Sequence, residues 1–273
     1  MIAQYLKTME KIGRYEFLAE PFHCDFSRRL TMGHFGNHLL NAADFHSNDR
    51  NFGMNYLNPR HLTWVLSRLA IEIEEMPKAY DRFTVETWVE SAMRFFTNRN
   101  FAVVGVQKQP ASLISQPSSP NKVYGFGRSV WAMIDTETRQ PVDILGMRDG
   151  EMLHWVEPEK ECPIAKSSRV KMTDQAELVR TIDTHYSDVD MNGHVNSIRY
   201  IEHVVDLWPI EWYREHSIRR FEVAYVAEAH AGDQLSFYRE QQGGDYFVRI
   251  CKDGGDEVVR CKITFIQREI LEK

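Results

Sequence analysis

The order of secondary structure predicted from the sequence occurs twice along the chain. A strand candidate at 15–26 precedes an apolar-periodic segment typical of a helix at 30–53, and runs with β-type alternation follow it. The same order returns from 179 onward, with a helix expected at 195–208 that stops at Pro209. The recurrence predicts an α+β fold made of two tandem copies of one unit, each a strand, a helix and an antiparallel meander. The β-rich runs that form the meanders are 61–76, 82–93, 99–108 and 123–136, and then 220–230, 233–240, 245–253 and 257–269.

The domain boundaries follow from this recurrence. We place the first unit at 1–150 and the second at 179–273, with a connector of mixed charge and weak periodicity at 151–178. A Pro- and Ser-rich stretch at 109–121 interrupts the first meander, and we expect it to be a long exposed hairpin loop.

A short sequence motif is shared by the two predicted helix starts and aligns them. GHF at 33–35 matches GHV at 193–195 at an offset of 160 residues. At that offset the first half has apolar residues where the second has an acid and an amide. We therefore expect the second half to carry the catalytic side chains and the first half to form a wall of the site without taking part in the reaction. The contrasting pairs are Leu30 with Asp190 and Met32 with Asn192.

The segment DVDMNGHVN at 188–196 opens like an EF-hand calcium loop. It has oxygen-bearing side chains at loop positions 1, 3 and 5, and a glycine at position 6. Position 12, where calcium needs a bidentate Glu, is Arg199. The residues before it, 179–188, alternate like a strand and do not resemble the entering helix of an EF-hand. These features argue against a calcium site.

Composition narrows the function classes. The net charge of -6 over 273 residues argues against a general nucleic-acid or anionic-membrane binder. The four cysteines are scattered without a CxxC pair, so we expect neither a disulfide framework nor a zinc site, and no metal or cofactor. No stretch approaches the roughly 18 apolar residues of a membrane span, and the N-terminus lacks an apolar signal core. A reducing cytoplasm is the expected location.

Three polar side chains cluster at the start of the second predicted helix. Asp190, Asn192 and His194 are spaced two apart just before and into its first turn. Helix N-terminal N–H groups and the Asn192 amide would favour negative charge on a carbonyl oxygen. His194 suits proton transfer near neutral pH, and Asp190 would orient its ring. The set fits the transfer of an acyl group to water, as in hydrolysis of an activated ester or thioester.

Glu228, in the strand segment that follows this helix, is the candidate base for the attacking water. Either Glu228 or His194 would take the proton, and the sequence does not choose between them. Taken alone, Asp190 or Asn192 is more often a helix N-cap, and a lone His194 or Glu228 is more often structural. The clustering of chemically matched groups is what favours catalysis.

The segment SDVDMNGHVNSIRYIEHVVD at 187–206 resembles the signature of the acyl-ACP thioesterases, which carry an Asp-x-Asn-x-His-Val-Asn run followed by Tyr. The Tyr-x-x-Glu at 225–228, followed by the Gly-Asp turn at 232–233, also resembles that family. Weaker matches at 64–68, 87–88, 98–101 and 131–135 extend the likeness over most of the chain. The matching signature residues are Asp190, Asn192, His194, Val195, Asn196 and Tyr200.

The resemblance implies a double hotdog fold, in which two long helices are each wrapped by an antiparallel sheet. It implies hydrolysis of acyl-acyl carrier protein to free fatty acid and holo-ACP, without cofactor or metal. It also implies catalytic roles for Asp190, Asn192, His194 and Glu228, with the N-terminal hotdog lining the acyl pocket. The implied partners are the acylated carrier protein and its fatty acyl chain, and the enzyme would be a monomer or a homodimer.

The chain departs from the family pattern in three ways. Ser197 replaces a frequent second Asn, which puts no catalytic role in doubt. Ala229 follows the candidate Glu where many plant members have Cys, and no plastid transit peptide is evident, which favours a bacterial-type cytoplasmic enzyme. An acyl-CoA hydrolase of the same fold and a non-catalytic acyl-binding module remain as alternatives. Because the carrier protein is acidic, docking needs a positive surface, although each arginine taken alone is more often part of a solvated face. The candidates are Arg214, Arg219 and Arg220, or Arg28 and Arg29.

Overall fold

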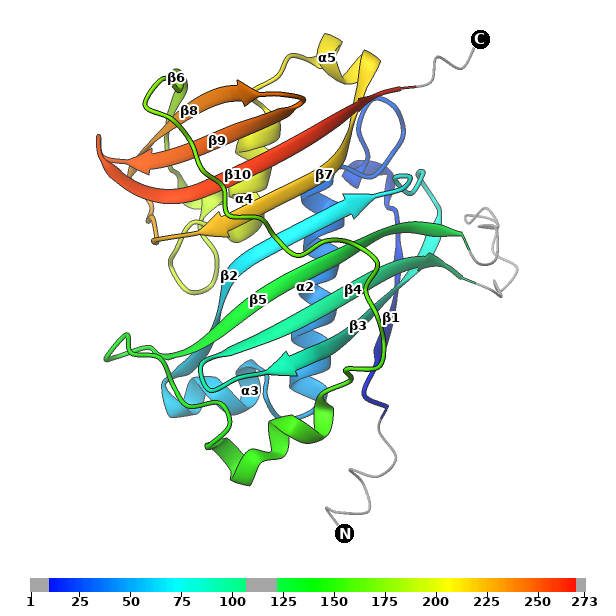
Figure 1. Ribbon diagram of the computed structural model, residues 1–273, viewed down its shortest axis with the longest axis vertical. Coiled ribbons are helices and arrows are strands. Elements are labelled where there is room, and N and C mark those ends of the chain that lie inside the picture. Colours follow the sequence, from blue (N-terminus) through cyan, green and yellow to red (C-terminus); the bar gives the residue numbers. More distant parts are fainter. Residues whose placement is uncertain (1–9, 107–121, 269–273) are drawn as a thin grey trace.

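The structure is a computed structural model that describes residues 10–106 and 122–268 (Figure 1). The predicted hairpin loop at 109–121 lies outside these residues.

The described strands form one ten-stranded sheet in the order β1-β3-β4-β5-β2-β7-β10-β9-β8-β6. Within each half, the order from the outer edge inward is the first, third, fourth, fifth and second strand of that half. The halves join where β2 pairs antiparallel with β7, from Arg68 opposite Ala224 to Glu72 opposite Arg220. The predicted tandem α+β architecture is therefore confirmed. The strands are β1 Gly13–Leu18, β2 Leu62–Ile73, β3 Arg82–Ala92, β4 Phe96–Gly105, β5 Val123–Asp135, β6 Glu177–Asp183, β7 His216–Tyr225, β8 Gln234–Gln242, β9 Asp245–Lys252 and β10 Asp256–Gln267.

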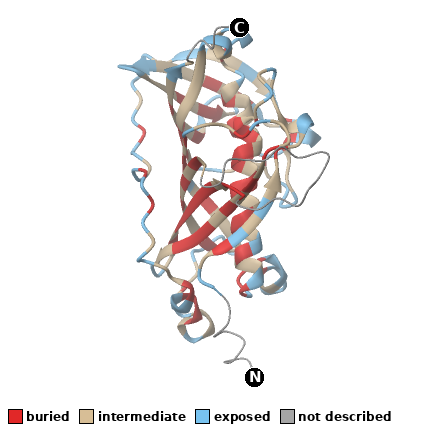
Figure 2. Ribbon diagram, turned by 90° about the vertical axis from the view of Figure 1, so that its right-hand side faces the viewer, coloured by how far each residue is buried: buried red, intermediate tan, exposed pale blue. Residues whose placement is uncertain are grey.

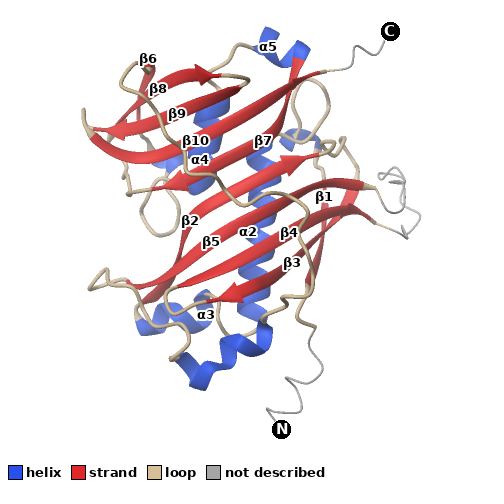
Figure 3. Ribbon diagram, viewed as in Figure 1, coloured by secondary structure: helices blue, strands red, loops and turns tan. Residues whose placement is uncertain are grey.

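Two helices, α2 (Met32–Asp49) and α4 (Ser197–Val205), pack on the same face of this sheet, as Figures 1 and 3 show. Side chains of Thr31 and Asn196 cap their N-termini. The second helix is shorter than the predicted 195–208, because its cap lies at Asn196 and the chain turns before Pro209. The short helices are α3 Met54–Leu57 and α5 Ile210–Glu215, and the 3-10 turns are η1 Pro21–His23, η2 Asn58–Arg60, η3 Met147–Trp155 and η4 Tyr186–Asp188.

One hydrophobic core runs through both units between the sheet and the helices (Figure 2). Leu39 of α2 and Ile201 of α4 are fully buried in it. Burying one such side chain stabilises a fold by about 1.5–3 kcal/mol. The helices approach closely at Gly33, where an added Cβ would lie 2.6 Å from Cγ of Glu202. Packing between the units therefore fixes how the loops at the helix starts face one another. No helix in 10–106 or 122–268 is long and apolar enough to cross a membrane.

The segment after η3 runs along the sheet face opposite the helices, as Figures 1 and 2 show. The backbone N–H and hydroxyl of Ser168 donate to Glu222 at 2.5 and 2.8 Å. The guanidinium of Arg128 donates to the carbonyls of Cys162 and Ile164, both at 2.8 Å. This segment thus covers the outer face of the sheet.

The two helix starts share a backbone design, but at an offset of 165 residues. Asp25 N–H donates to the Arg29 carbonyl at 2.8 Å, and Asp190 N–H donates to the His194 carbonyl at 2.9 Å. Isolated bridges close both loops, joining 24 to 30 and 189 to 195. The offset of 160 suggested by the Gly-His motif is therefore wrong: Gly33 lies inside a helix, whereas Gly193 has a φ of +81° in a turn.

At the corrected offset of 165 residues, different residues of the two halves occupy equivalent positions. The first unit has Asp25 opposite Asp190, so it keeps the acid that the sequence comparison had assigned to the second unit alone. The other two positions differ chemically, with Ser27 opposite Asn192 and Arg29 opposite His194.

Candidate active site

The loop at 190–194 is a tight turn that precedes α4. The Asp190 carboxylate accepts a hydrogen bond from Asn192 N–H at 2.8 Å, and Gly193 supplies the left-handed backbone that the turn requires. The loop does not reach the first helical turn, which corrects the sequence-based placement. The cap of α4 is Asn196, whose side chain already accepts from Ile198 N–H at 2.8 Å.

His194 meets Glu228 in the structure. The His194 Nε2 lies 3.4 Å from Glu228 Oε2, and both side chains are about one third exposed, at 27% and 32%. Val195 N–H donates to the Ala229 carbonyl at 2.7 Å, which ties the loop to the bend that carries Glu228. In the described residues no ion pair joins Asp190 to His194, so the carboxylate facing the imidazole is Glu228.

Two cations hold Glu228 in place. Arg139, in the turn after β5 of the first unit, donates to its Oε1 at 2.5 Å. Lys252 Nζ donates to the Glu228 backbone carbonyl at 3.1 Å. With Oε1 engaged, Oε2 is the oxygen that faces His194. The sequence offered no signal for Arg139, because its contact crosses from one unit to the other.

His194, Glu228 and His230 each offer one metal-ligand atom, and the three atoms lie within 4.8 Å of one another. The Arg139 guanidinium on Glu228 argues against a cation there, since it would repel a metal ion and already occupies one carboxylate oxygen. We assign these residues no metal role.

A pocket opens beside Asn192, with about 700 Å³ of empty space that includes some open solvent. Asn192 is its one lining residue from the second unit among those that the structure describes. Two tryptophans on the wall, Trp64 and Trp131, fall in segments that resembled the family. The first-unit lining residues are Leu40, Ala43, Asp44, Ser47, Met54, Leu57, Asn58, Thr63, Trp64, Val89, Thr97, Arg99, Trp131 and Met152.

Most of the arginines considered for docking are engaged within the chain. Arg219 pairs with Glu72 and Glu74, Arg220 with Glu72 and Glu222, and Arg29 with Glu75. Arg214 lies over the Phe26 ring at 5.2 Å, whereas Arg28 is exposed. These ion pairs favour the solvated-face interpretation for Arg219 and Arg220.

Comparisons with known proteins agree with this architecture. Residues 12–147 match the acyl-ACP thioesterase N-terminal domain, and residues 171–267 match the C-terminal domain. An acyl-ACP thioesterase structure from Bacteroides thetaiotaomicron is 49% identical, with a TM-score of 0.82, over 94% of this chain and 98% of that one. The 12:0-ACP thioesterase from Umbellularia californica has a TM-score of 0.79 at 22% identity, over 95% and 99% of the two chains, which shows the fold alone.

A curated plant relative is more distant. The chloroplastic oleoyl-acyl carrier protein thioesterase 2 of Arabidopsis thaliana is 24% identical over 80% of this chain. The chain spans 60% of that relative's length. Both family domains are nevertheless matched in order along the chain, and the hotdog-type fold expected from the resemblance is confirmed by the solved structures. The chain therefore belongs to the acyl-ACP thioesterase family.

Proposed function

We propose that this protein hydrolyses the thioester of acyl-acyl carrier protein to free fatty acid and holo-ACP, without a cofactor. The observation that carries the proposal is the His194–Glu228 pair, 3.4 Å apart, next to a loop whose Asn192 lines the pocket. A proton acceptor thus lies next to a loop whose amide donor, Asn192, lines a pocket walled by the first unit.

We place the acyl chain in the first unit, whose residues form all but one part of the described pocket wall. This gives the N-terminal hotdog, proposed at 1–150, the role of acyl-pocket wall, and the C-terminal hotdog, proposed at 179–273, the catalytic role. The segment at 151–178 connects them. The thioester carbonyl would lie beside Asn192, where the two units meet.

The reaction needs one proton acceptor and one oxyanion donor. Water attacks the thioester carbon while the His194–Glu228 pair accepts its proton, and the Asn192 amide donates to the oxyanion. The C–S bond then breaks, and the carrier's thiolate takes a proton as the fatty acid leaves. Asp190 acts through the loop by holding the Asn192 backbone, and Arg139 fixes Glu228.

Release of free fatty acid from acyl-ACP tests the proposal. We expect the Asp190→Ala/His194→Ala double variant to lose at least about 1000-fold in kcat/KM, and Asn192→Ala to lose about 100-fold in kcat. Asp25→Ala is the matched control, because it breaks the equivalent loop bond in the first unit, where Asp25 accepts from Ser27 N–H at 2.8 Å. Asp25→Ala should keep wild-type turnover. Wild-type release no faster than that of the double variant would refute the proposal.

The competing functions give different results in the same assay. An acyl-CoA hydrolase would prefer the CoA ester over the ACP ester of the same chain. An acyl-binding module would bind acyl-ACP without turnover. Side-by-side kinetics on both esters, with binding measured on the double variant, separates the three.

The pairing of the two units and the state of the cysteines bear on the oligomeric state and the compartment of the protein. We propose a monomer in a reducing cytoplasm, since β2 and β7 already pair the two units within one chain and all four cysteines are free. Light scattering of the purified protein tests the monomer, and a particle of twice the chain mass would show the homodimer instead.

A further inference from the structure

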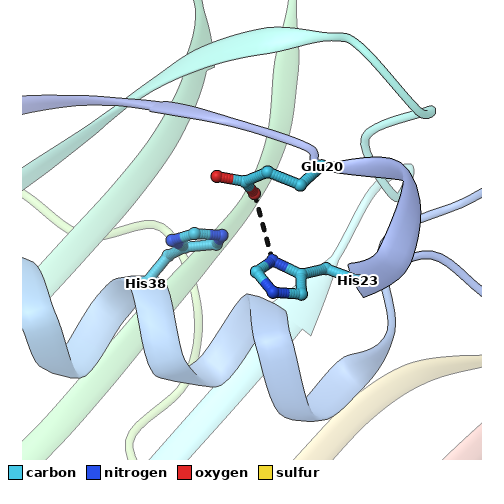
Figure 4. Close-up of side chains that lie close together, drawn as sticks. All are labelled: Glu20, His23 and His38. Carbon is cyan, nitrogen blue, oxygen red and sulfur yellow. Dashed lines mark hydrogen bonds and ion pairs between the residues drawn. The ribbon is translucent and has the colours of Figure 1, made fainter.

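A second polar cluster lies in the first unit, away from the residues of the candidate active site. Glu20 follows β1, His23 ends η1, and His38 belongs to α2. One nitrogen of each histidine and one oxygen of Glu20 all lie within 4.8 Å of one another. Figure 4 shows the three side chains converging from these different elements.

His38 lacks any polar partner within this cluster. Its side chain is buried, with 7% of the residue exposed, and neither ring nitrogen has a hydrogen-bond partner among residues 10–106 and 122–268. The ring packs against Phe17 and Phe83, at centroid distances of 4.6 and 5.3 Å. A buried polar group without a partner destabilises the fold. An imidazole in this position is therefore expected to bind either a hydrogen-bonding group or a metal ion.

In the second unit the equivalent histidine has a hydrogen-bonding partner. At the offset of 165, His203 is the counterpart of His38, and Asp188 is the counterpart of His23. His203 Nε2 lies 2.9 Å from the Asp188 carboxylate, which provides the missing partner. In the first unit that carboxylate is replaced by a second imidazole. Imidazole nitrogens bind metal ions through their lone pairs, so a cation held between the two rings would give the His38 ring the partner that it lacks.

We propose that Glu20, His23 and His38 bind a zinc ion, with water as the fourth ligand. Two imidazole nitrogens and one carboxylate are a donor set that favours zinc over magnesium or calcium. Zinc bonds of about 2.0–2.2 Å would bring neighbouring ligand atoms to about 3.3 Å in a tetrahedral site. His23 Nδ1 and Glu20 Oε2 are already 3.1 Å apart. A His38 nitrogen lies within 4.8 Å of a ligand atom of each, so zinc binding would draw the three side chains closer together.

The site is open to solution on one side. The side chains of His23 and Glu20 are 39% and 43% exposed, which gives the ion a path to the buried His38. Once bound, zinc would fasten the chain after β1 to the middle of α2. The effect expected of this link is a more stable first unit. The expectation of no zinc site rested on the absence of cysteine pairs, whereas the donors here are histidines and a carboxylate from three separate elements.

Zinc titration of the full chain after removal of metals by a chelator tests the proposal. We expect one zinc per chain by calorimetry, and a rise in Tm of about 5 °C when free zinc is about 100-fold above Kd. The Glu20→Gln/His23→Ala variant should bind zinc at least about 100-fold more weakly, since it removes two of three ligands. Both side chains are partly exposed, so this variant should fold.

His230→Ala is the matched control, because it disrupts the other histidine–carboxylate cluster. It should bind zinc as tightly as the wild type. The proposal is overturned if zinc at about 100 µM gives neither binding heat nor a Tm shift. It is also overturned if the Glu20→Gln/His23→Ala variant keeps the affinity, or if His230→Ala loses it.

Discussion

The stability of this protein should depend on pH through one buried histidine, His46. Only 1% of the residue is exposed, and both ring nitrogens are hydrogen-bonded. Arg99 Nη1 donates to Nδ1 at 3.2 Å, so Nε2 carries the proton and donates to the Lys11 carbonyl at 3.0 Å. Burial, together with the positive charges of Arg99 and Arg50, lowers the pKa of His46 to about 2.

The sign and size of the effect follow from this pKa. In the unfolded chain a histidine has a pKa of about 6.5, so between roughly pH 6.5 and 2 the unfolded chain binds one more proton than the folded chain at His46. Its contribution to folding stability is therefore complete above pH 6.5 and is lost progressively as the pH falls. At pH 5.0, about 1.5 units below 6.5, the loss is about 2 kcal/mol.

Urea unfolding of wild type and His46→Gln at pH 7.5 and pH 5.0 measures the pH-dependent contribution of His46 to the free energy of unfolding. The variant loses the ring's hydrogen bonds and should be less stable at pH 7.5. Its deficit should shrink by about 2 kcal/mol at pH 5.0, because only the wild type retains the titrating group. His154→Gln, at an exposed position, should show the same difference from wild type at both pH values. A His46→Gln deficit that does not change with pH would refute the reasoning.

Three further changes probe the site. Ala43→Phe fills part of the pocket wall, so kcat/KM across an acyl-ACP series should shift toward shorter chains, with Tm confirming that the variant folds. Arg139→Ala frees one oxygen of Glu228, and kcat should fall about 10- to 100-fold with little change in KM, measured by steady-state kinetics. Gly193→Ala places a Cβ in open space at a φ of +81°, so urea unfolding should show only the strain, about 1 kcal/mol.

Much of the fold could be predicted because local patterns repeat. The alternation of apolar residues and the recurrence of strand, helix and meander gave the tandem units. Element ends were less predictable. The second helix was expected from 195 to 208, yet its cap is Asn196 and α4 ends at Val205. Propensity does not distinguish the residues of a tight loop from those of a first helical turn when both are polar.

Three of the four predicted site residues, Asp190, Asn192 and His194, lie in one short segment, and this clustering made the site predictable. His194 and Glu228 were expected to meet, and they lie 3.4 Å apart. The catalytic roles remain predictions. Arg139 could not be predicted, because its position depends on how the turn after β5 reaches the other unit. The partner of the His194 ring was also misassigned, since Asp190 uses its carboxylate to close its own loop.

The corrected alignment of the units explains why one chain rather than two identical ones would carry this site. Leu30 N–H donates to the Pro77 carbonyl as Val195 N–H donates to the Ala229 carbonyl, so Met76, the residue before Pro77, has the position of Glu228. Arg29, the counterpart of His194, pairs with Glu75 at 3.0 Å and donates to the backbone carbonyl of Met76. In a symmetric dimer, any change that makes one loop catalytic is copied into the other. Tandem fusion removes that constraint, so the first unit can hold its loop with an arginine ion pair while the second uses the same backbone for the proposed chemistry.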